Sequence, residues 1–188
     1  MAPPGGELIE LSVLFVDVRG FTALSEQMSA NEAVGQLNRF YNLSAETVFA
    51  LDGTLDKMVG DQVMAFFGAP FRPEDHQKRA VEAALTIVAG MDAMLPDGNA
   101  FSVGGAVASG MMFMGNVGEG EVRDFTVIGD VVNTAARLQA EAMAGEVLVT
   151  EDTYQAMAPH TQDSPIRVLE LRGKEAPVPV RVLRDLPV

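Results

Sequence analysis

Two aspartates stand at the ends of predicted strands, where their carboxylates could hold a metal ion. Asp17 follows the apolar run LSVLFV, and Asp61 lies in the middle of the segment TLDKMVGDQVMAFF, residues 54–67. A strand and a hairpin are natural sheet neighbours, so both carboxylates could converge at one end of a sheet and hold one or two Mg²⁺ ions, which take few protein ligands. Each aspartate also has an ordinary alternative: Asp17 could begin a turn or cap a helix, and Gly-Asp is common in hairpin turns.

The residues that follow Asp17 could bind phosphate. The segment RGFT leads into a predicted helical start, so the amides of Phe21 and Thr22 would point outward from a helix N-terminus. Free amides at such a terminus bind phosphate oxygens well.

Lys57 stands in the strand that precedes the Gly-Asp turn. A lysine in a strand usually keeps its ammonium in water. The apolar neighbours Leu55, Met58 and Val59 favour instead a partly enclosed side chain with a hydrogen-bond acceptor, which the spacing does not identify.

The segment DFTVIGDVVNTAARL, residues 124–138, carries a second polar group. Asn133 and Arg137 are four residues apart and project from one face of a predicted helix. An amide and a guanidinium together suit a phosphate and the charge that develops beside it, although a solvent-facing polar edge is the alternative. Thr126, on the preceding short strand, offers a hydroxyl, and Lys174 in the segment RGKEAP stands in a hairpin turn where lysines are usually solvated.

The elements that must position these residues alternate between helices and strands. Apolar periodicity predicts a buried strand at 11–18, a helix at 29–51 with a Ser29–Glu32 capping box, the hairpin at 54–67 and a helix at 73–95. A turn at 96–99 and two strands broken at Gly110 follow, then the short strand and helix of the second polar group. A further strand, a short helix and a terminal hairpin end the chain.

This order predicts an α+β fold, a mostly antiparallel sheet with helices on one face. Six residues at helical spacing are predicted to line one face of the helix at 29–51: Val34, Leu37, Tyr41, Ser44, Val48 and Leu51.

Composition limits the classes of protein that the chain can represent. The 188 residues are 48% hydrophobic and 21% charged, which is typical of one globular domain, predicted here as residues 1–188 with a core at about 11–183. The absence of cysteine excludes disulfides and cysteine-based metal sites. A net charge of −13 makes nucleic acid and anionic membranes poor partners. No signal peptide or membrane span is apparent, so we expect a soluble domain located in the cytoplasm.

Taken together, four segments resemble the catalytic domain of class III nucleotidyl cyclases. They are FVDVRGFT, LDKMVGDQVMAFFG, RDFTVIGDVVNTAARL and LRGKEAPVPV, and they occur in the order typical of that family. The resemblance implies a ferredoxin-like, palm-type sheet with helices packed on it. It also implies that Asp17, Asp61 and the backbone carbonyl of Val18 bind two ions of Mg²⁺ or Mn²⁺ in each active site.

The resemblance also implies roles in binding and turning over ATP. Lys57 and Thr126 would bind adenine, Asn133 would orient the ribose, and Arg137 would stabilise charge on the transferring phosphate. Lys174 matches the triphosphate-binding lysine of the family. The implied activity is that of an adenylyl cyclase, which forms 3′,5′-cyclic AMP and pyrophosphate by two-metal-ion catalysis.

Active sites of this family lie at a head-to-tail dimer interface, so the resemblance implies a homodimer with two symmetric sites. One chain would supply the aspartates and the other Lys57, Thr126, Asn133 and Arg137. Many adenylyl cyclases have aspartate at the position of Thr126, and the chain is most like the bacterial enzymes with threonine there. A guanylyl cyclase and a catalytically silent nucleotide-binding regulatory domain are the alternatives, whereas a diguanylate cyclase is disfavoured because the hairpin reads VGDQV rather than GGDEF.

Overall fold

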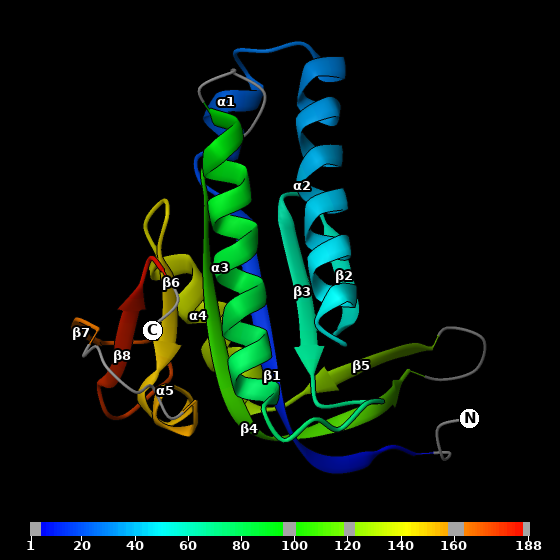
Figure 1. Ribbon diagram of the computed structural model, residues 1–188, viewed down its shortest axis with the longest axis vertical. Coiled ribbons are helices and arrows are strands. Elements are labelled where there is room, and N and C mark those ends of the chain that lie inside the picture. The colour runs from blue at the N-terminus through cyan, green and yellow to red at the C-terminus, as the bar shows by residue number, and fades with distance from the viewer. Residues whose placement is uncertain (1–4, 96–100, 119–122, 158–163, 186–188) are drawn as a thin grey trace.

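The computed structural model describes residues 5–95, 101–118, 123–157 and 164–185, and it shows an α+β fold built on one sheet of eight strands (Figure 1). The turn predicted at 96–99 lies outside the described residues. In chain order the elements are β1 (Glu7–Val18), α1 (Phe21–Ser25), α2 (Ala30–Ala50), β2 (Thr54–Val59), β3 (Gln62–Phe67), α3 (His76–Met94), β4 (Val103–Val117), β5 (Asp124–Ile128), α4 (Asp130–Glu141), β6 (Val147–Thr150), α5 (Glu151–Ala156), β7 (Ile166–Leu169) and β8 (Val178–Leu183).

The sheet is mostly antiparallel, as predicted. Its strand order is β2-β3-β1-β4-β6-β8-β7, and β5 pairs with β4 outside this path. Only the pairing of β4 with β6 is parallel among the described strands. Strand β1 lies between β3 and β4 and is buried without interruption from Leu11 to Val16, which explains why this run is apolar on both faces.

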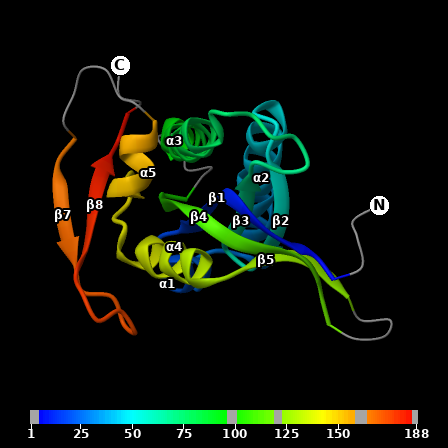
Figure 2. The ribbon, with the colours of Figure 1, turned by 90° about the horizontal axis from the view of Figure 1, so that it is seen from below.

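Helices cover both faces of the sheet, so the prediction that they share one face is wrong. Leu14, Val16 and Val18 of β1 pack with α2 and α3, whereas the alternate residues pack with α4 on the opposite face. Figure 2 shows α2, α3 and α5 on one side of the sheet and α4 on the other. Because Val13 to Val16 of β1 are apolar at every position, this part of the strand requires cover on both faces, and α4 supplies the second layer.

Strand β4 is one continuous strand of 15 residues, not the two strands predicted on either side of Gly110. It pairs with β1 from Val103 to Met114, and its far end pairs with β5. Gly110 is needed because α4 packs closely against it: a Cβ atom there would lie 2.8 Å from Val131 Cγ2. The glycine therefore marks a close contact rather than the end of a strand. Together the outer parts of β1, β4 and β5 project from the body as an arm (Figure 2).

The predicted helices are confirmed, with one error in the buried face of α2. Ser29 and Glu32 form the expected capping box. The face predicted from helical spacing includes Val34, which is 54% exposed, whereas the buried side of the helix consists of Ala33, Gln36, Phe40, Ser44, Thr47 and Val48. Apolar spacing misplaced this face because three of its six buried residues, Gln36, Ser44 and Thr47, are polar. Within the described residues, no helix is long and apolar enough to cross a membrane.

Candidate active site

Asp17 and Asp61 lie at the same end of the sheet, as predicted. Strands β1 and β3 are antiparallel neighbours with Asp17 opposite Gln62, and the amide of Val18 donates a 3.0 Å hydrogen bond to the carbonyl of Asp61. The β2–β3 turn that carries Asp61 begins with Gly60 at φ +60°, a conformation for which two-residue hairpin turns select glycine. The hydroxyl of Tyr41 on α2 donates to the carbonyl of Gly60 and so holds this turn from outside the sheet.

The two carboxylates repel each other in the absence of a cation. Burial, and then the negative charge of Asp61, raise the pKa of Asp17 from 3.8 to about 6, although Arg19 and Gln139 oppose this shift. Oδ1 of Asp17 is buried and has no hydrogen-bond partner among the described residues. A buried carboxylate oxygen without a donor, next to a second carboxylate, has the properties of a cation ligand.

This pair fits a hard divalent ion that keeps water or phosphate in part of its coordination shell. The described residues contain no group of three or more His, Cys, Asp or Glu side chains that could hold a metal by themselves. Mg²⁺ is commonly bound by one or two carboxylates together with the phosphates of a substrate.

Sequence reasoning missed two residues beside the carboxylates. Arg19 lies close enough to Asp17 and Asp61 to interact with both charges, and its Nη2 donates to the backbone carbonyl of Gln139 at 2.7 Å. Gln139, on the buried side of α4, accepts a 3.3 Å hydrogen bond from Gln62. A signal for Arg19 was present, since it directly follows the strand that ends at Val18. No sequence pattern indicates Gln139, because the packing of α4 under the sheet brings it there.

Lys57 and Thr126 belong to a second group, which forms between β2 and β5. Nζ of Lys57 donates to Asp56 at 2.9 Å and also to Asp124, and the Thr126 hydroxyl donates to Asp56 at 2.6 Å. Burial lowers the pKa of Lys57, but the hydrogen bonds to the two aspartates outweigh burial and raise it. Lys57 therefore has the partly enclosed setting and the hydrogen-bond acceptors that the sequence predicts. The acceptors are Asp56 and Asp124, and the spacing of the sequence identified neither.

A β-bulge explains how neighbouring residues of one strand reach the same group. Leu55 pairs with Ala65 and Lys57 with Met64, so Asp56 is an extra residue on β2 with no partner on β3. In a regular strand, consecutive side chains point to opposite faces. The bulge breaks this alternation, so both side chains reach β5: Asp56 contacts Thr126, and Lys57 contacts Asp124.

Asn133 and Arg137 share one side of α4, as predicted. Asn133 is exposed, Arg137 is partly exposed, and neither side chain forms a hydrogen bond or ion pair with another described residue. Each residue turns an α-helix by about 100°, so Gln139 lies about 200° around α4 from Arg137. Because Gln139 is on the side next to Asp17, Arg137 points away from the carboxylates of its own chain.

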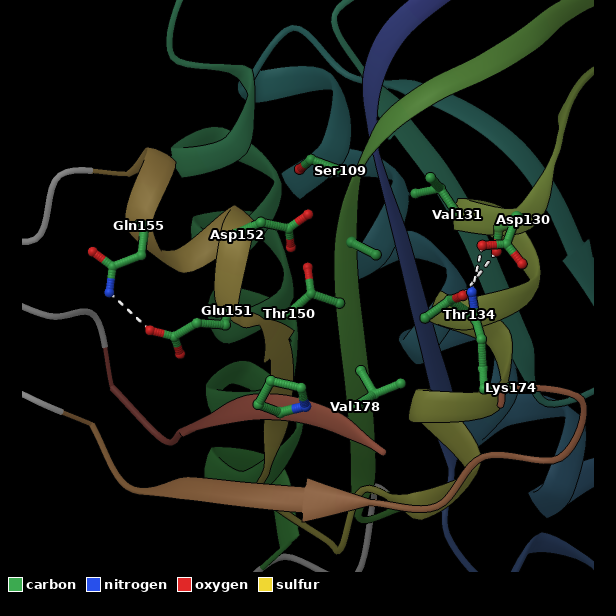
Figure 3. A pocket seen from close by; sticks show the side chains of 12 residues that line it. Ser109, Asp130, Val131, Thr134, Thr150, Glu151, Asp152, Gln155, Lys174 and Val178 are labelled. Atoms are coloured by element: carbon green, nitrogen blue, oxygen red, sulfur yellow. Dashed lines mark hydrogen bonds and ion pairs between the residues drawn. The ribbon is translucent and has the colours of Figure 1, made fainter. Parts of the chain in front are cut away.

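The terminal hairpin comes close to this exposed side of α4. The backbone at Gly173 lies against Arg137, since a Cβ atom built on Gly173 would be 3.2 Å from Arg137 Nη1. Lys174 forms an ion pair with Asp130 at the start of α4. Figure 3 shows this pair at one side of a cavity of about 520 Å³, which also extends to Glu151 and Gln155 of α5.

That cavity contains neither the Asp17–Asp61 pair nor the Lys57–Thr126 group. Phe21 and Thr22 lie at the start of α1, where the Phe21 ring packs edge-on against Phe101 at 5.4 Å and Thr22 is exposed. The predicted residues therefore form separate groups on one chain, and no hydrogen bond or ion pair between described residues joins the carboxylates to the Lys57–Thr126 group.

Residues 7–179 match the sequence profile of the family described as adenylate and guanylate cyclase catalytic domain. The chain is 35% identical over 183 residues to the uncharacterized protein Rv1319c of Mycobacterium tuberculosis, an alignment that covers 95% of this chain and 34% of that protein. It is 34% identical over 178 residues to the uncharacterized protein Rv1320c of the same organism, with coverages of 93% and 31%. The chain thus spans about a third of the length of these curated relatives.

Two solved structures share the fold over nearly their whole length. The guanylyl cyclase Cya2 superposes with a TM-score of 0.87 at 25% identity, with 95% of this chain and 93% of that chain covered. The adenylyl cyclase CyaB from P. aeruginosa superposes with a TM-score of 0.86 at 29% identity, with 96% of each chain covered. One of these neighbours is a guanylyl and the other an adenylyl cyclase, so the likeness does not distinguish ATP from GTP.

Proposed function

This chain belongs to the family of adenylate and guanylate cyclase catalytic domains, and from that premise we propose that it is an adenylyl cyclase. The reaction would convert ATP into 3′,5′-cyclic AMP and pyrophosphate at two symmetric sites of a homodimer. Within the described part of the chain, three features support this proposal: the carboxylate pair, the Lys57–Thr126 group, and the Arg137 guanidinium on α4, which has no partner among the described residues.

The observation that carries the preference for ATP is the Lys57 ammonium. A lysine side chain has three hydrogen-bond donors and no acceptor. Two of the donors of Lys57 are directed to Asp56 and Asp124, which leaves one for the base. N1 of adenine accepts a hydrogen bond, whereas N1 of guanine carries a hydrogen, so a donor at this position favours ATP.

Asp17, Asp61 and the backbone carbonyl of Val18 would hold up to two divalent ions, Mg²⁺ or Mn²⁺. When bound, such ions lower the pKa of a hydroxyl nucleophile and neutralise phosphate charge. The nearby amides of Phe21 and Thr22 would bind phosphate oxygens, and the ion pair of Lys174 with Asp130 would open for Lys174 to reach the triphosphate.

On α4, Asn133 would hydrogen-bond the ribose and keep its 3′-oxygen in line with the α-phosphorus. Arg137 would stabilise the charge that develops on the transferring phosphate, as a guanidinium does when it donates to phosphate oxygens in fixed geometry. No partner in the described residues competes for either side chain.

The orientation of α4 supports a site shared between two chains. Because Arg137 points away from Asp17 of its own chain, a nucleotide bound to those carboxylates would meet Arg137 only if a second chain supplied it. The apolar side chains Met58, Val59 and Phe125, which lie near the Lys57–Thr126 group, are 43%, 65% and 40% exposed in the single chain and would be covered in such a dimer.

Product analysis tests the proposed activity directly. The purified domain would be incubated with equal ATP and GTP, in Mg²⁺ and then in Mn²⁺, and its products identified by mass spectrometry. We expect cyclic AMP to exceed cyclic GMP in both ions. Predominant cyclic GMP would make the chain a guanylyl cyclase, and nucleotide binding without any cyclic product would make it a silent regulatory domain.

A further inference from the structure

Asp56 is the most enclosed member of the Lys57–Thr126 group. Its side chain has no solvent-exposed surface, and it interacts with two groups at once. Oδ1 accepts the 2.9 Å hydrogen bond from Nζ of Lys57, and Oδ2 accepts the 2.6 Å hydrogen bond from Oγ1 of Thr126. A carboxylate enclosed between an ammonium and a hydroxyl is firmly held, since such hydrogen bonds are stronger than neutral ones.

The contact with Asp56 fixes the direction of the single hydroxyl proton of Thr126. An ionised carboxylate accepts hydrogen bonds and cannot donate them, so the hydroxyl must be the donor in this pair. Its proton is then committed to Asp56, and only the lone pairs of Oγ1 remain for another partner. Towards a nucleotide, Thr126 therefore acts as an acceptor alone.

Resting on the adenylyl cyclase function proposed above, we infer that Asp56 is a positioning residue that sets base specificity by holding the hydroxyl of Thr126 as an acceptor. The 6-amino group of adenine donates hydrogen bonds, whereas the 6-oxo group of guanine only accepts them. A hydroxyl whose proton is held by Asp56 can accept a hydrogen bond from the 6-amino group of adenine, but it cannot donate one to the 6-oxo group of guanine.

The β-bulge is what makes this arrangement possible. Without the extra residue on β2, Asp56 and Lys57 would point to opposite faces of the strand. With it, Lys57 faces N1 of the base while Asp56, directly beside it, controls the residue that faces position 6. The bulge in β2 thus positions both Lys57, which faces N1, and Asp56, which holds Thr126.

The test compares ATP with purine riboside triphosphate, an analogue that keeps N1 but lacks the 6-amino group. The ratio of kcat/KM for these two nucleotides isolates the hydrogen bond at position 6. For the unchanged protein we expect a ratio of about 5 to 10 in favour of ATP, the size of one net hydrogen bond. In Asp56→Asn the side-chain amide can donate to Oγ1 as well as accept from it, so the proton is no longer committed, and the ratio falls towards 1 while use of GTP relative to ATP rises.

Two further variants separate this role from a general structural one. Asp124→Asn removes the other carboxylate from Lys57 without contacting Thr126, so it acts through N1 and should leave the ratio unchanged. Thr126→Val removes the hydroxyl, should bring the ratio to about 1, and should make Asp56→Asn without further effect on the ratio when the two are combined.

A wild-type ratio in Asp56→Asn overturns the inference, and so does an effect of Asp56→Asn on the ratio when Thr126 is already valine. If Asp56→Asn cannot be purified folded, a wild-type ratio in Thr126→Val overturns it as well. These outcomes differ from failure of the proposed function, which would appear as a lack of cyclic AMP from ATP in the unchanged protein.

Discussion

Replacing Asp17 by asparagine should stabilise the metal-free domain while abolishing its activity. The side chain keeps its size, but the charge that faces Asp61 is removed. Replacing a residue that stabilises the fold would lower the free energy of unfolding. Replacing a residue that is kept for cation binding, at a cost to the fold, should raise it.

The magnitude follows from the pKa of Asp17, which rises from 3.8 to about 6 on folding because of burial and the Asp61 carboxylate. Each pKa unit corresponds to about 1.4 kcal/mol, so ionising Asp17 in the fold costs about 3 kcal/mol before solvent screening, and about 1–2 kcal/mol after it. The folded-state pKa lies above the unfolded one, so the stability linked to this group is fully present below pH 3.8 and is lost as the pH rises through about 6.

The assay is urea denaturation of both proteins with EDTA at pH 5 and pH 8. Asp17→Asn should exceed the unchanged protein by about 1–2 kcal/mol in free energy of unfolding at pH 8 and by about half as much at pH 5, because the unfolded chain is already ionised at Asp17 there. Added Mg²⁺ or Mn²⁺ should stabilise the unchanged protein at pH 8 but not the variant. A variant that is equally or less stable at pH 8 would refute the charge repulsion on which this reasoning depends.

Three further predictions concern residues around the site and the ion pair between Glu151 of α5 and Arg181 of β8. Arg137→Ala should lower kcat by about 100-fold or more with little change in melting temperature, because the guanidinium has no partner among the described residues; steady-state kinetics and calorimetry check this. Tyr41→Phe removes the hydrogen bond to the carbonyl of Gly60, so it should cost about 1 kcal/mol and raise the metal concentration needed for half-maximal activity. Glu151→Gln should cost about 1–2 kcal/mol at pH 7, since its hydrogen bonds with Arg181 lower the pKa of Glu151 from 4.5 to about 2; the difference should disappear as the pH falls from about 4.5 through 2 in acid titrations of stability.

Much of the fold followed from local patterns in the sequence. The continuous apolar run of β1, the capping box of α2 and the Gly-Asp turn each act over a few residues, so they were read correctly without knowledge of packing. The errors at Val34 and Gly110 have the opposite character. Whether Val34 is buried depends on which side of α2 meets the sheet, and Gly110 lies within a strand because α4 approaches it from elsewhere in the chain.

The candidate site was predictable in its parts and not in its connections. Asp17 and Asp61 could be placed together because neighbouring strands impose this, and Asn133 and Arg137 because helical spacing does. Asp56 could not be identified, since a bulge in β2 decides which way it points and nothing in the sequence marks that bulge.

The orientation of α4 was likewise invisible in the sequence. Only the packed helix shows that Arg137 faces away from Asp17 of its own chain, and this feature is the main support for a site built from two chains.

Mixing two inactive variants tests that central claim most directly. Asp17→Ala and Arg137→Ala would each be purified, combined in equal amounts and assayed for cyclic AMP. If chains exchange freely, half of the dimers are mixed and each mixed dimer has one intact site, so activity should recover to about a quarter of the wild-type value. Activity no higher than that of the separate variants, in a mixture shown by mass spectrometry to contain mixed dimers, would contradict a site shared between two chains.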